Sequence, residues 1–191
     1  MEIQLILRSL ISALLLLATP VYSNIGEIAE SKGDSTIKRD KTAYTGEVGL
    51  GLEMNDNVVT GKGKLRLDFV DDTRVDVTEN SRMTIDEFIY DPQSKVGKIV
   101  SNIKIGTVRI ITGEISKKNP DNLEVNVPTG SVGARGTEFV VVTESDEKST
   151  VVLLGPGKKN TLGMIPGILN VSDGFNTVNI STPGFQSVVF K

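Results

Sequence analysis

The sequence predicts an all-β fold, a single domain of short strands that is solenoid-like or sandwich-like, with no significant helix after residue 23. Three observations support this prediction. From about residue 46 onward, apolar and polar residues alternate with the period of two that is typical of half-buried strands. Glycine, asparagine, aspartate and proline separate the short runs, and tight turns favour these residues. Beyond residue 23, no stretch of ten residues repeats apolar residues at the 3.6-residue spacing of a helix.

The composition is that of a globular domain, and it restricts the chemistry that the chain can perform. Of the 191 residues, 38% are hydrophobic and 24% are charged, which suits one domain with a buried core. The net charge of −3 offers no basic excess to a phosphate backbone, so no nucleic-acid partner is expected. Histidine and cysteine are absent, which excludes disulfides, most transition-metal sites, and Ser-His-Asp or Cys-His catalysis. We therefore expect that the protein is not an enzyme and binds no cofactor. The alternative is catalysis by a pair of carboxylates, as in glycosidases.

The first 23 residues are typical of a secretory signal peptide. Arg8 supplies positive charge, and an apolar stretch follows over residues 10–18. Val21 and Ser23 are acceptable at the −3 and −1 positions of a cleavage site. The apolar stretch is shorter than the roughly 20 residues that span a bilayer. We expect cleavage, export to the periplasm or the exterior, and no stable membrane insertion afterwards; an uncleaved anchor is the alternative.

Beyond the predicted signal peptide, the expected strands follow one another with short turns between them. Residues 24–44 are polar and mixed, with weak strand patterns near both ends of the segment. The later alternation is clear, because Leu65, Leu67 and Phe69 face one way while the intervening residues face the other. Gly106 is expected to break the pattern between two strands. Strands are expected at residues 58–60, 65–69, 75–77, 83–90, 99–105, 108–111, 123–127, 139–142 and 151–154.

A glycine-rich block at residues 128–142 is the most distinctive part of the sequence. Gly130, Gly133 and Gly136 fall within seven residues, and Arg135 lies between the last two. Glycines this dense indicate a backbone with positive φ or a close approach to a neighbouring strand. A strand follows the block, where a phosphate-binding loop would be followed by a helix. The block is therefore interpreted as a turn and strand that stabilise the domain.

Residues 156–191 are expected to form a C-terminal β extension that packs on the same domain. A short repeat occurs here: residues 174–180 and 184–190 share the order glycine, phenylalanine, amide, hydroxyl, valine, any residue, apolar residue. Two such copies favour neighbouring strands or successive coils that bury the same face, with chance similarity as the alternative. The polar positions of the repeat are candidates for an interaction face. They are Asn176, Thr177, Gln186 and Ser187.

The glycine-rich block resembles the most characteristic motif of the FecR domain family, roughly T-P-T-A-x-x-G-x-R-G-T-E-F. Val127 stands where threonine is common, and Gly130-Ser131 replaces alanine-threonine. Other segments resemble family elements in the same order, so the similarity spans about residues 25–155. The motif positions are expected to be mainly structural. They are Pro128, Thr129, Gly133, Arg135, Gly136, Thr137, Glu138 and Phe139.

The resemblance implies an all-β domain at residues 24–155 and a role in the cell envelope. Family members named for iron-citrate signalling are inner-membrane sigma regulators with a cytoplasmic arm, one transmembrane helix and a periplasmic FecR domain. Only a few residues precede the apolar stretch here, so the chain resembles the stand-alone exported members. The expected function is a non-enzymatic module that binds an envelope protein or a glycan. The alternative is a sensory or regulatory component of TonB- or sigma-type signalling that acts through a separate membrane partner.

Two groups of residues are candidates for a binding site. Arg135 with Glu138 could bind a carboxylate or phosphate, but an internal ion pair that pins the glycine-rich turn is the favoured interpretation. Oxygen-bearing side chains could also bind calcium, although none matches the EF-hand or nonapeptide spacing and all are common in turns. These side chains are Asn55, Asp56, Asn57, Asp68, Asp71, Asp72, Asp86, Glu87 and Asp91.

Overall fold

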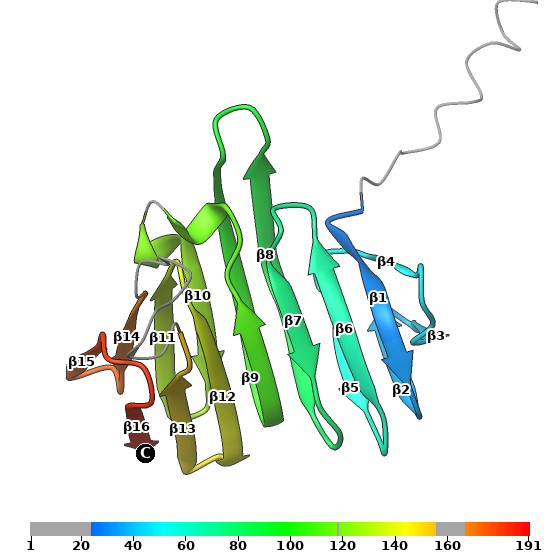
Figure 1. Ribbon diagram of the computed structural model, residues 1–191. Helices are drawn as coiled ribbons and strands as arrows, with labels where there is room; N and C mark the ends of the chain where they lie inside the picture. Colours follow the sequence, from blue (N-terminus) through cyan, green and yellow to red (C-terminus); the bar gives the residue numbers. More distant parts are fainter. Residues whose placement is uncertain (1–23, 118, 156–166) are drawn as a thin grey trace, which may run out of the picture.

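The computed structural model describes residues 24–117, 119–155 and 167–191, which are mostly β-strand (Figure 1). The prediction of an all-β fold is confirmed, because the helical segments among these residues are two short 3₁₀ turns, Ile115–Lys117 (η2) and Pro120–Asn122 (η3). A membrane-spanning helix is not found among the described residues. The predicted signal peptide and residues 156–166 of the predicted extension lie outside them.

Short turns separate the strands, and several use aspartate or asparagine with positive φ. Asp72, which stands where the family pattern has glycine, has a φ of 67° in the turn between the strands Lys64–Phe69 and Arg74–Val77. The short side chains of aspartate and asparagine tolerate this left-handed conformation better than those of most other residues. The described strands are β1 (Gly26–Lys32), β2 (Ser35–Arg39), β3 (Thr42–Thr45), β4 (Gly51–Leu52), β5 (Asn57–Thr60), β6 (Lys64–Phe69), β7 (Arg74–Val77), β8 (Arg82–Asp91), β9 (Val96–Ile111), β10 (Leu123–Val127), β11 (Gly130–Arg135), β12 (Glu138–Ser145), β13 (Lys148–Leu153), β14 (Ile168–Ser172), β15 (Thr177–Ile180) and β16 (Gln186–Phe190).

The strands form one continuous, open network of pairings that divides into two rows (Figure 1). The first row has the order β4-β1-β6-β7-β9-β12-β13-β16, and the second has the order β3-β2-β5-β8-β9-β10-β11-β14-β15. Strand β9 belongs to both rows. The chain passes repeatedly from one row to the other, usually after one or two strands, so residues far apart in sequence come to lie on the same face.

Strand β9 joins the rows by changing partners along its length. Residues 96–105 pair with β8, and residues 106–111 pair with β12. The sequence predicted two strands separated by Gly106; the structure has one long strand that changes rows at this residue. Gly106 has a φ of 101°, and a Cβ atom there would lie 2.5 Å from the Cα of Ser81. Both the backbone conformation and the close approach therefore require glycine.

One hydrophobic core lies between the two rows. The alternation predicted for β6 is present: Leu65, Leu67 and Phe69 are buried, whereas the residues between them are partly exposed. Phe69 of the first row stacks on Phe88 of the second, with ring centroids 5.4 Å apart. Burial of such side chains supplies the main favourable contribution to folding.

Residues 167–191 lengthen both rows at one end. Strand β14 pairs with β11 in the second row, and β16 pairs with β13 in the first. The two copies of the short repeat thus provide the terminal strands, β15 and β16, of the two rows. They do not bury equivalent positions, because Ile180 is the buried residue of β15 whereas Val189, one position earlier in the repeat, is buried in β16. The prediction of a shared buried face is wrong: a one-residue offset exchanges the inward and outward faces of a strand.

Candidate functional site

The glycine-rich block carries the chain from the second row to the first. Its first half forms the turn after β10 and strand β11, and its second half begins β12. Gly136 has a φ of 57° in the connection between these strands. A Cβ atom there would have no neighbour within 4 Å, so it is the backbone conformation that favours glycine at this position. Phe139, the last motif residue, is completely buried in the core. Pro128 and Thr129 occupy the β10–β11 turn, and Gly133 lies within β11.

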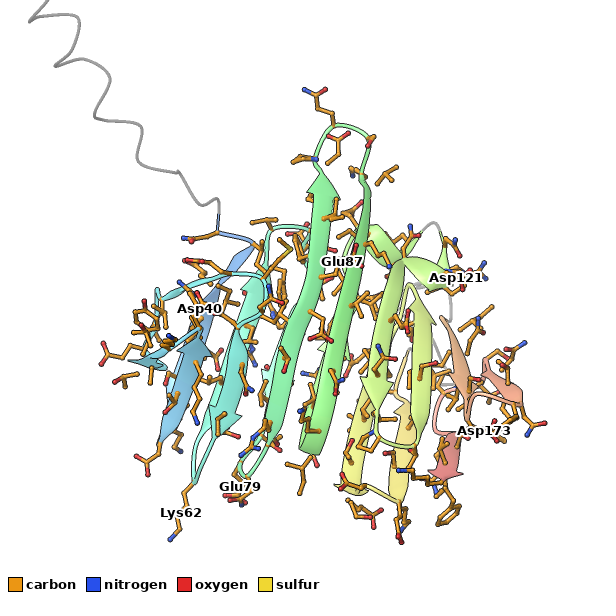
Figure 2. All side chains as sticks on the ribbon, turned by 180° about the vertical axis from the view of Figure 1, so that it is seen from behind. Asp40, Lys62, Glu79, Glu87, Asp121 and Asp173 are labelled. Atoms are coloured by element: carbon orange, nitrogen blue, oxygen red, sulfur yellow. The ribbon has the colours of Figure 1, made fainter. Side chains whose placement is uncertain are left out.

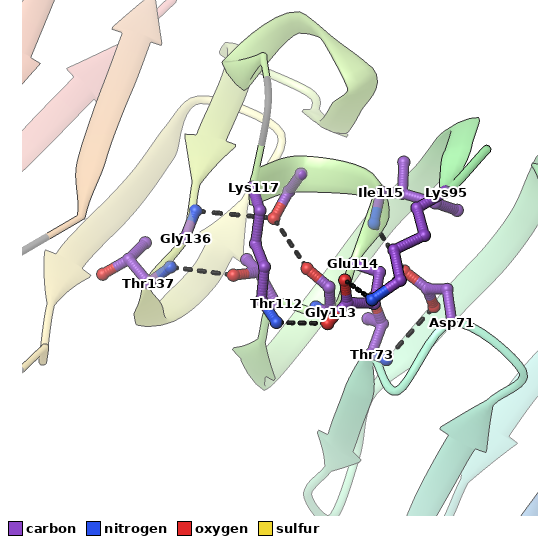
Figure 3. A network of polar contacts seen from close by, with 11 residues as sticks. Asp71, Thr73, Lys95, Thr112, Gly113, Glu114, Ile115, Lys117, Gly136 and Thr137 are labelled. Carbon is purple, nitrogen blue, oxygen red and sulfur yellow. Dashed lines mark hydrogen bonds and ion pairs between the residues drawn. The ribbon is translucent and has the colours of Figure 1, made fainter. Parts of the chain in front are cut away.

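Hydrogen bonds attach this connection to the segment after β9 (Figure 3). The backbone N–H of Thr137 donates to the hydroxyl of Thr112 at 2.8 Å, and the backbone N–H of Thr112 donates to the carbonyl of Thr137 at 3.0 Å. The N–H of Gly136 donates to the hydroxyl of Ser116 at 3.4 Å. These bonds attach the crossing between rows to the segment after β9 through the motif residues Gly136 and Thr137.

Asp71 lies at the centre of a second part of the same network (Figure 3). Its carboxylate accepts hydrogen bonds from the hydroxyl of Thr73 at 2.8 Å, from the N–H of Thr73 at 3.1 Å and from the N–H of Ile115 at 3.3 Å. Burial raises the pKa of Asp71, and these hydrogen bonds partly oppose the increase. Asp71 thereby connects the β6–β7 turn to η2. The sequence indicated only that Asp71 lies in a turn, and the contact with η2 was not predicted.

A row of alternating charges crosses five strands on the outward face of the first row. Glu30 pairs with Arg66, Arg66 with Asp76 at 2.8 Å, Asp76 with Arg109 at 2.6 Å, and Arg109 with Glu138 at 2.7 Å. We call these five residues the charge ladder. Direct cross-strand positions place the first four opposite one another on β1, β6, β7 and β9. Opposite charges at such positions stabilise neighbouring strands.

The charge ladder replaces the ion pair that was predicted within the glycine-rich block. Glu138 pairs with Arg109 rather than with Arg135, and the Arg135 side chain has no ion pair with any described residue. Arg135 ends β11 in the second row with an exposed side chain, whereas Glu138 begins β12 in the first. Proximity in sequence was misleading because the chain changes rows between these residues.

The ionisation of the charge ladder follows from its contacts. Burial acts to raise the pKa of Asp76, but hydrogen bonds from Arg66 and Arg109 outweigh it and hold the pKa below its usual value. The hydrogen bond to Asp76 raises the pKa of Arg66, and the bonds to Glu138 and Asp76 raise that of Arg109. Asp76, Arg66 and Arg109 are therefore charged at neutral pH.

A hollow of about 670 Å³ lies over the charge ladder, and we call it the ladder hollow. Four ladder residues line it, and Ala29 and Val48 provide an apolar wall. At one end it adjoins a smaller hollow of about 320 Å³, and both share Lys32, Lys64 and Thr78. The ladder hollow is thus large enough for a small molecule and combines fixed charges with apolar surface. The residues that line the ladder hollow are Ala29, Glu30, Ser31, Lys32, Val48, Lys64, Leu65, Arg66, Asp76, Val77, Thr78 and Arg109.

Most acidic residues considered as calcium ligands contact other protein groups. Asp56 is buried and accepts hydrogen bonds from the guanidinium of Arg39 at 2.8 Å. Asp68 pairs with Arg74 at 3.0 Å, and Asp91 caps its own turn through Ser94 at 2.6 Å. Within the described ranges, no three acidic side chains gather in the way that a metal ion requires. The geometry gives these carboxylates roles in turns and ion pairs.

The predicted interaction face lies at the C-terminal end of both rows. Asn176 and Thr177 lie at the start of β15, and Gln186 and Ser187 start β16. Thr177 also lines a hollow of about 390 Å³ on the outward face of the second row, which Gly133 lines as well. The sequence interpretation chose these polar residues and missed the exposed apolar ones beside them. Those are Phe175, Val178, Phe185, Val188 and Phe190.

Comparison with known proteins identifies a family and a distant structural likeness. The family described as FecR protein matches residues 56–156, just over half of the chain. The chain is also similar to two crystal structures, at 2.50 and 1.65 Å resolution, of a proposed anti-sigma factor from Parabacteroides distasonis ATCC 8503. Sequence identity to this chain is 15% in each case, and the TM-scores are 0.49 and 0.48. Each match covers 69% of this chain and 53% of the other, so the chain spans about half the length of those proteins. A search of curated proteins gives no match.

Proposed function

Because the chain belongs to the FecR family, we propose that it is an exported, non-enzymatic regulatory domain that acts by binding an envelope protein. The family match begins in the region of β5 and ends just after β13, so it leaves out the terminal strands β15 and β16. Those strands are the part of this chain that we propose binds the partner. We call them, with Phe175 and Phe185, the C-terminal edge.

The observation that carries the proposal is the exposed, uncharged character of the C-terminal edge. Phe175 is 96% exposed, Phe185 62% and Phe190 64%, so three aromatic rings face solvent at one end of the molecule. Neither β15 nor β16 contains a charged residue. Sheet proteins usually protect an edge strand from pairing with other chains by placing charges or proline on it. An edge without that protection, beside apolar side chains, suits a protein partner.

The geometry favours a partner that adds an extended strand. Strand β16 pairs with β13 along one side, and no described strand pairs with its other side. Its free backbone groups can form hydrogen bonds with an extended segment, while outward side chains such as Val188 provide apolar contacts. At the opposite end of the rows, the ring of Tyr44 in β3 instead contacts the guanidinium of Arg39, 5.3 Å from the ring centroid.

The non-enzymatic assignment rests on composition and on the contacts of the carboxylates. The chain has no histidine or cysteine, so it lacks the residue that most often transfers protons in catalysis and the most reactive side-chain nucleophile. Asp56, Asp71 and Asp76 are bonded to arginine, threonine or backbone groups that fix their positions.

The proposed export of the protein rests on the sequence pattern of residues 1–23. We propose the periplasm or the exterior as the site of action.

The proposal is tested by charge substitution on the edge. A double variant, Val188→Lys with Phe190→Lys, places two charges on the exposed side of β16. A matched control, Ile89→Lys with Val96→Lys, makes the same change at exposed apolar residues of the β8–β9 hairpin. Both variants are expressed from the full chain in the native host, and envelope fractions are cross-linked and analysed by mass spectrometry.

We expect one envelope protein to be cross-linked to the wild type and to the control but not to the edge variant. Circular dichroism and the melting temperature confirm that all three proteins are folded. Equal recovery of the partner with the edge variant would exclude β16 as the docking strand. Failure to recover any envelope protein with the wild type, or a product confined to the cytoplasm, would contradict the proposed function.

A further inference from the structure

Two lysines lie directly opposite each other at the mouth of the ladder hollow. Lys32 of β1 and Lys64 of β6 are cross-strand partners, and both are exposed. Like charges at such positions repel each other and destabilise the strand pair. Lys62 lies two residues before Lys64 and lines the adjoining smaller hollow with both of them. Three cations thus gather in a chain whose net charge is negative.

The charge ladder beside these lysines neutralises its own charges. Within the charge ladder, every arginine contacts two carboxylates. Asp68, which lies opposite Glu27, is compensated by Arg74 at 3.0 Å. No described residue forms an ion pair with Lys32, Lys62 or Lys64. Glu79 lines the smaller hollow beside them without pairing, and in Figure 2 it projects from the same end of the molecule as Lys62.

We propose that the ladder hollow binds a soluble organic anion that carries at least two carboxylate or phosphate groups. The ammonium groups of Lys32 and Lys64, which line the ladder hollow, provide hydrogen-bond donors and positive charge, and Lys62 adds positive charge from the adjoining smaller hollow. Nε and Nη1 of the Arg66 guanidinium donate to Asp76 and Glu30, whereas Nη2 donates no hydrogen bond to a described residue and can donate to an anion. Ala29 and Val48 form an apolar wall against which the uncharged part of the ligand packs.

The balance of charge in the lining favours an anion over a cation. The ladder hollow is lined by the four cations Lys32, Lys64, Arg66 and Arg109, against two carboxylates. The two carboxylates are already bonded to the arginines. Arg66 and Arg109 line the hollow together with the two lysines, which favours a small soluble ligand that enters the hollow, whereas a flat membrane surface would contact only the exposed lysines. This site is separate from the C-terminal edge, and neither proposal depends on the other.

The test measures binding of two soluble anions by isothermal titration calorimetry and of one membrane probe by vesicle sedimentation. The soluble probe is a tricarboxylate, tricarballylate, with inorganic pyrophosphate as a second anion. The membrane probe is a vesicle of phosphatidylglycerol and phosphatidylcholine. The variant Lys32→Gln with Lys64→Gln is compared with Lys38→Gln and Lys41→Gln, a control with the same change in charge at exposed lysines outside the hollow.

We expect saturable binding of a soluble anion by the wild type and the control, and a Kd at least about tenfold weaker in the Lys32/Lys64 variant, equivalent to about 1.4 kcal/mol. Binding is expected to weaken as salt increases. The Lys32/Lys64 variant is expected to melt no lower than the wild type, because a repulsive pair is removed. Equal losses in both double variants, no binding of either soluble anion, or binding to vesicles alone would overturn the proposal.

Discussion

Replacement of Arg109 by glutamine removes one of the two cations of the charge ladder. The Arg109 guanidinium donates to Glu138 at 2.8 Å and to Asp76 at 2.6 Å, and it joins strands β7 and β12, which flank β9. Glutamine keeps much of the aliphatic stem but carries no charge. Arg135→Gln is the matched control, because it makes the same chemical change at an arginine without an ion pair among the described residues.

The expected cost follows from the contacts that each residue loses. Arg109 is 35% exposed, so solvent screens its ion pairs, and the pairs are worth less than buried ones. Loss of two charge-assisted contacts costs about 1–2 kcal/mol, since Glu138 loses the cation that it contacts while Asp76 keeps Arg66. At about 2–4 °C per kcal/mol for a chain of this size, the melting temperature falls by about 2–8 °C. Arg135→Gln is expected to change the free energy of unfolding by less than about 0.5 kcal/mol.

Urea denaturation at low and high salt measures both effects. The stability difference between Arg109→Gln and the wild type is expected to shrink at high salt, because salt screens surface ion pairs. The reasoning would be refuted if Arg135→Gln destabilised the protein as much as Arg109→Gln does. That result would restore the Arg135–Glu138 pair that the sequence suggested, in place of the observed Arg109–Glu138 pair.

Three further substitutions test the connections between rows and the ionisation of the ladder. Asp71→Ala removes the acceptor of three buried hydrogen bonds and is expected to cost about 2–4 kcal/mol in chemical denaturation. The folded-state pKa of Asp76 is depressed, so its contribution is present at neutral pH and is lost as pH falls below about 4; Asp76→Asn should therefore lessen the decline of stability in acid. The measurement is the free energy of unfolding of the wild type and of Asp76→Asn from pH 6 to pH 2. A parallel decline in the two proteins would contradict this role of Asp76. Gly106→Ala is expected to cost more than about 2 kcal/mol because of its positive φ and its contact with Ser81. Gly133→Ala, whose Cβ would meet the carbonyl of Pro120 at an ordinary 3.4 Å, should change stability by less than about 0.5 kcal/mol, and equal effects would contradict this account.

Strand positions were predictable from the sequence because local patterns determine them. Leu65, Leu67 and Phe69 alternate with polar residues, and that alternation alone identifies the buried face of β6. The change of rows within β9 was not predictable, because Gly106 can end a strand or bend it, and only the close approach of Ser81 decides between these outcomes. Burial in the terminal repeat was mispredicted for a related reason: pairing with β13 and β14 sets the register, and the repeat itself does not.

The candidate site was harder to predict because it is built from residues that are distant in sequence. Glu30 and Glu138 belong to one charge ladder although more than a hundred residues separate them. The outward charges at Arg66 and Asp76 were visible as the polar half of an alternating pattern. Their partners depend on which strands become neighbours, and strand order is not encoded in the alternation. The same limit explains the expected pair between Arg135 and Glu138.

Strand β9 has a consequence for how the domain resists opening. Among the described strands, none of β1–β8 pairs with any of β10–β16, and each half pairs with β9. Two halves that share one strand can lose their hydrogen bonds separately, so the domain should behave in native-state hydrogen exchange as two cooperative units. Each amide of β9 bonds to a strand on one side only, so those bonded to β7 or β8 should exchange with one unit and those bonded to β10 or β12 with the other. The halves that carry the ladder hollow and the C-terminal edge can therefore differ in local stability.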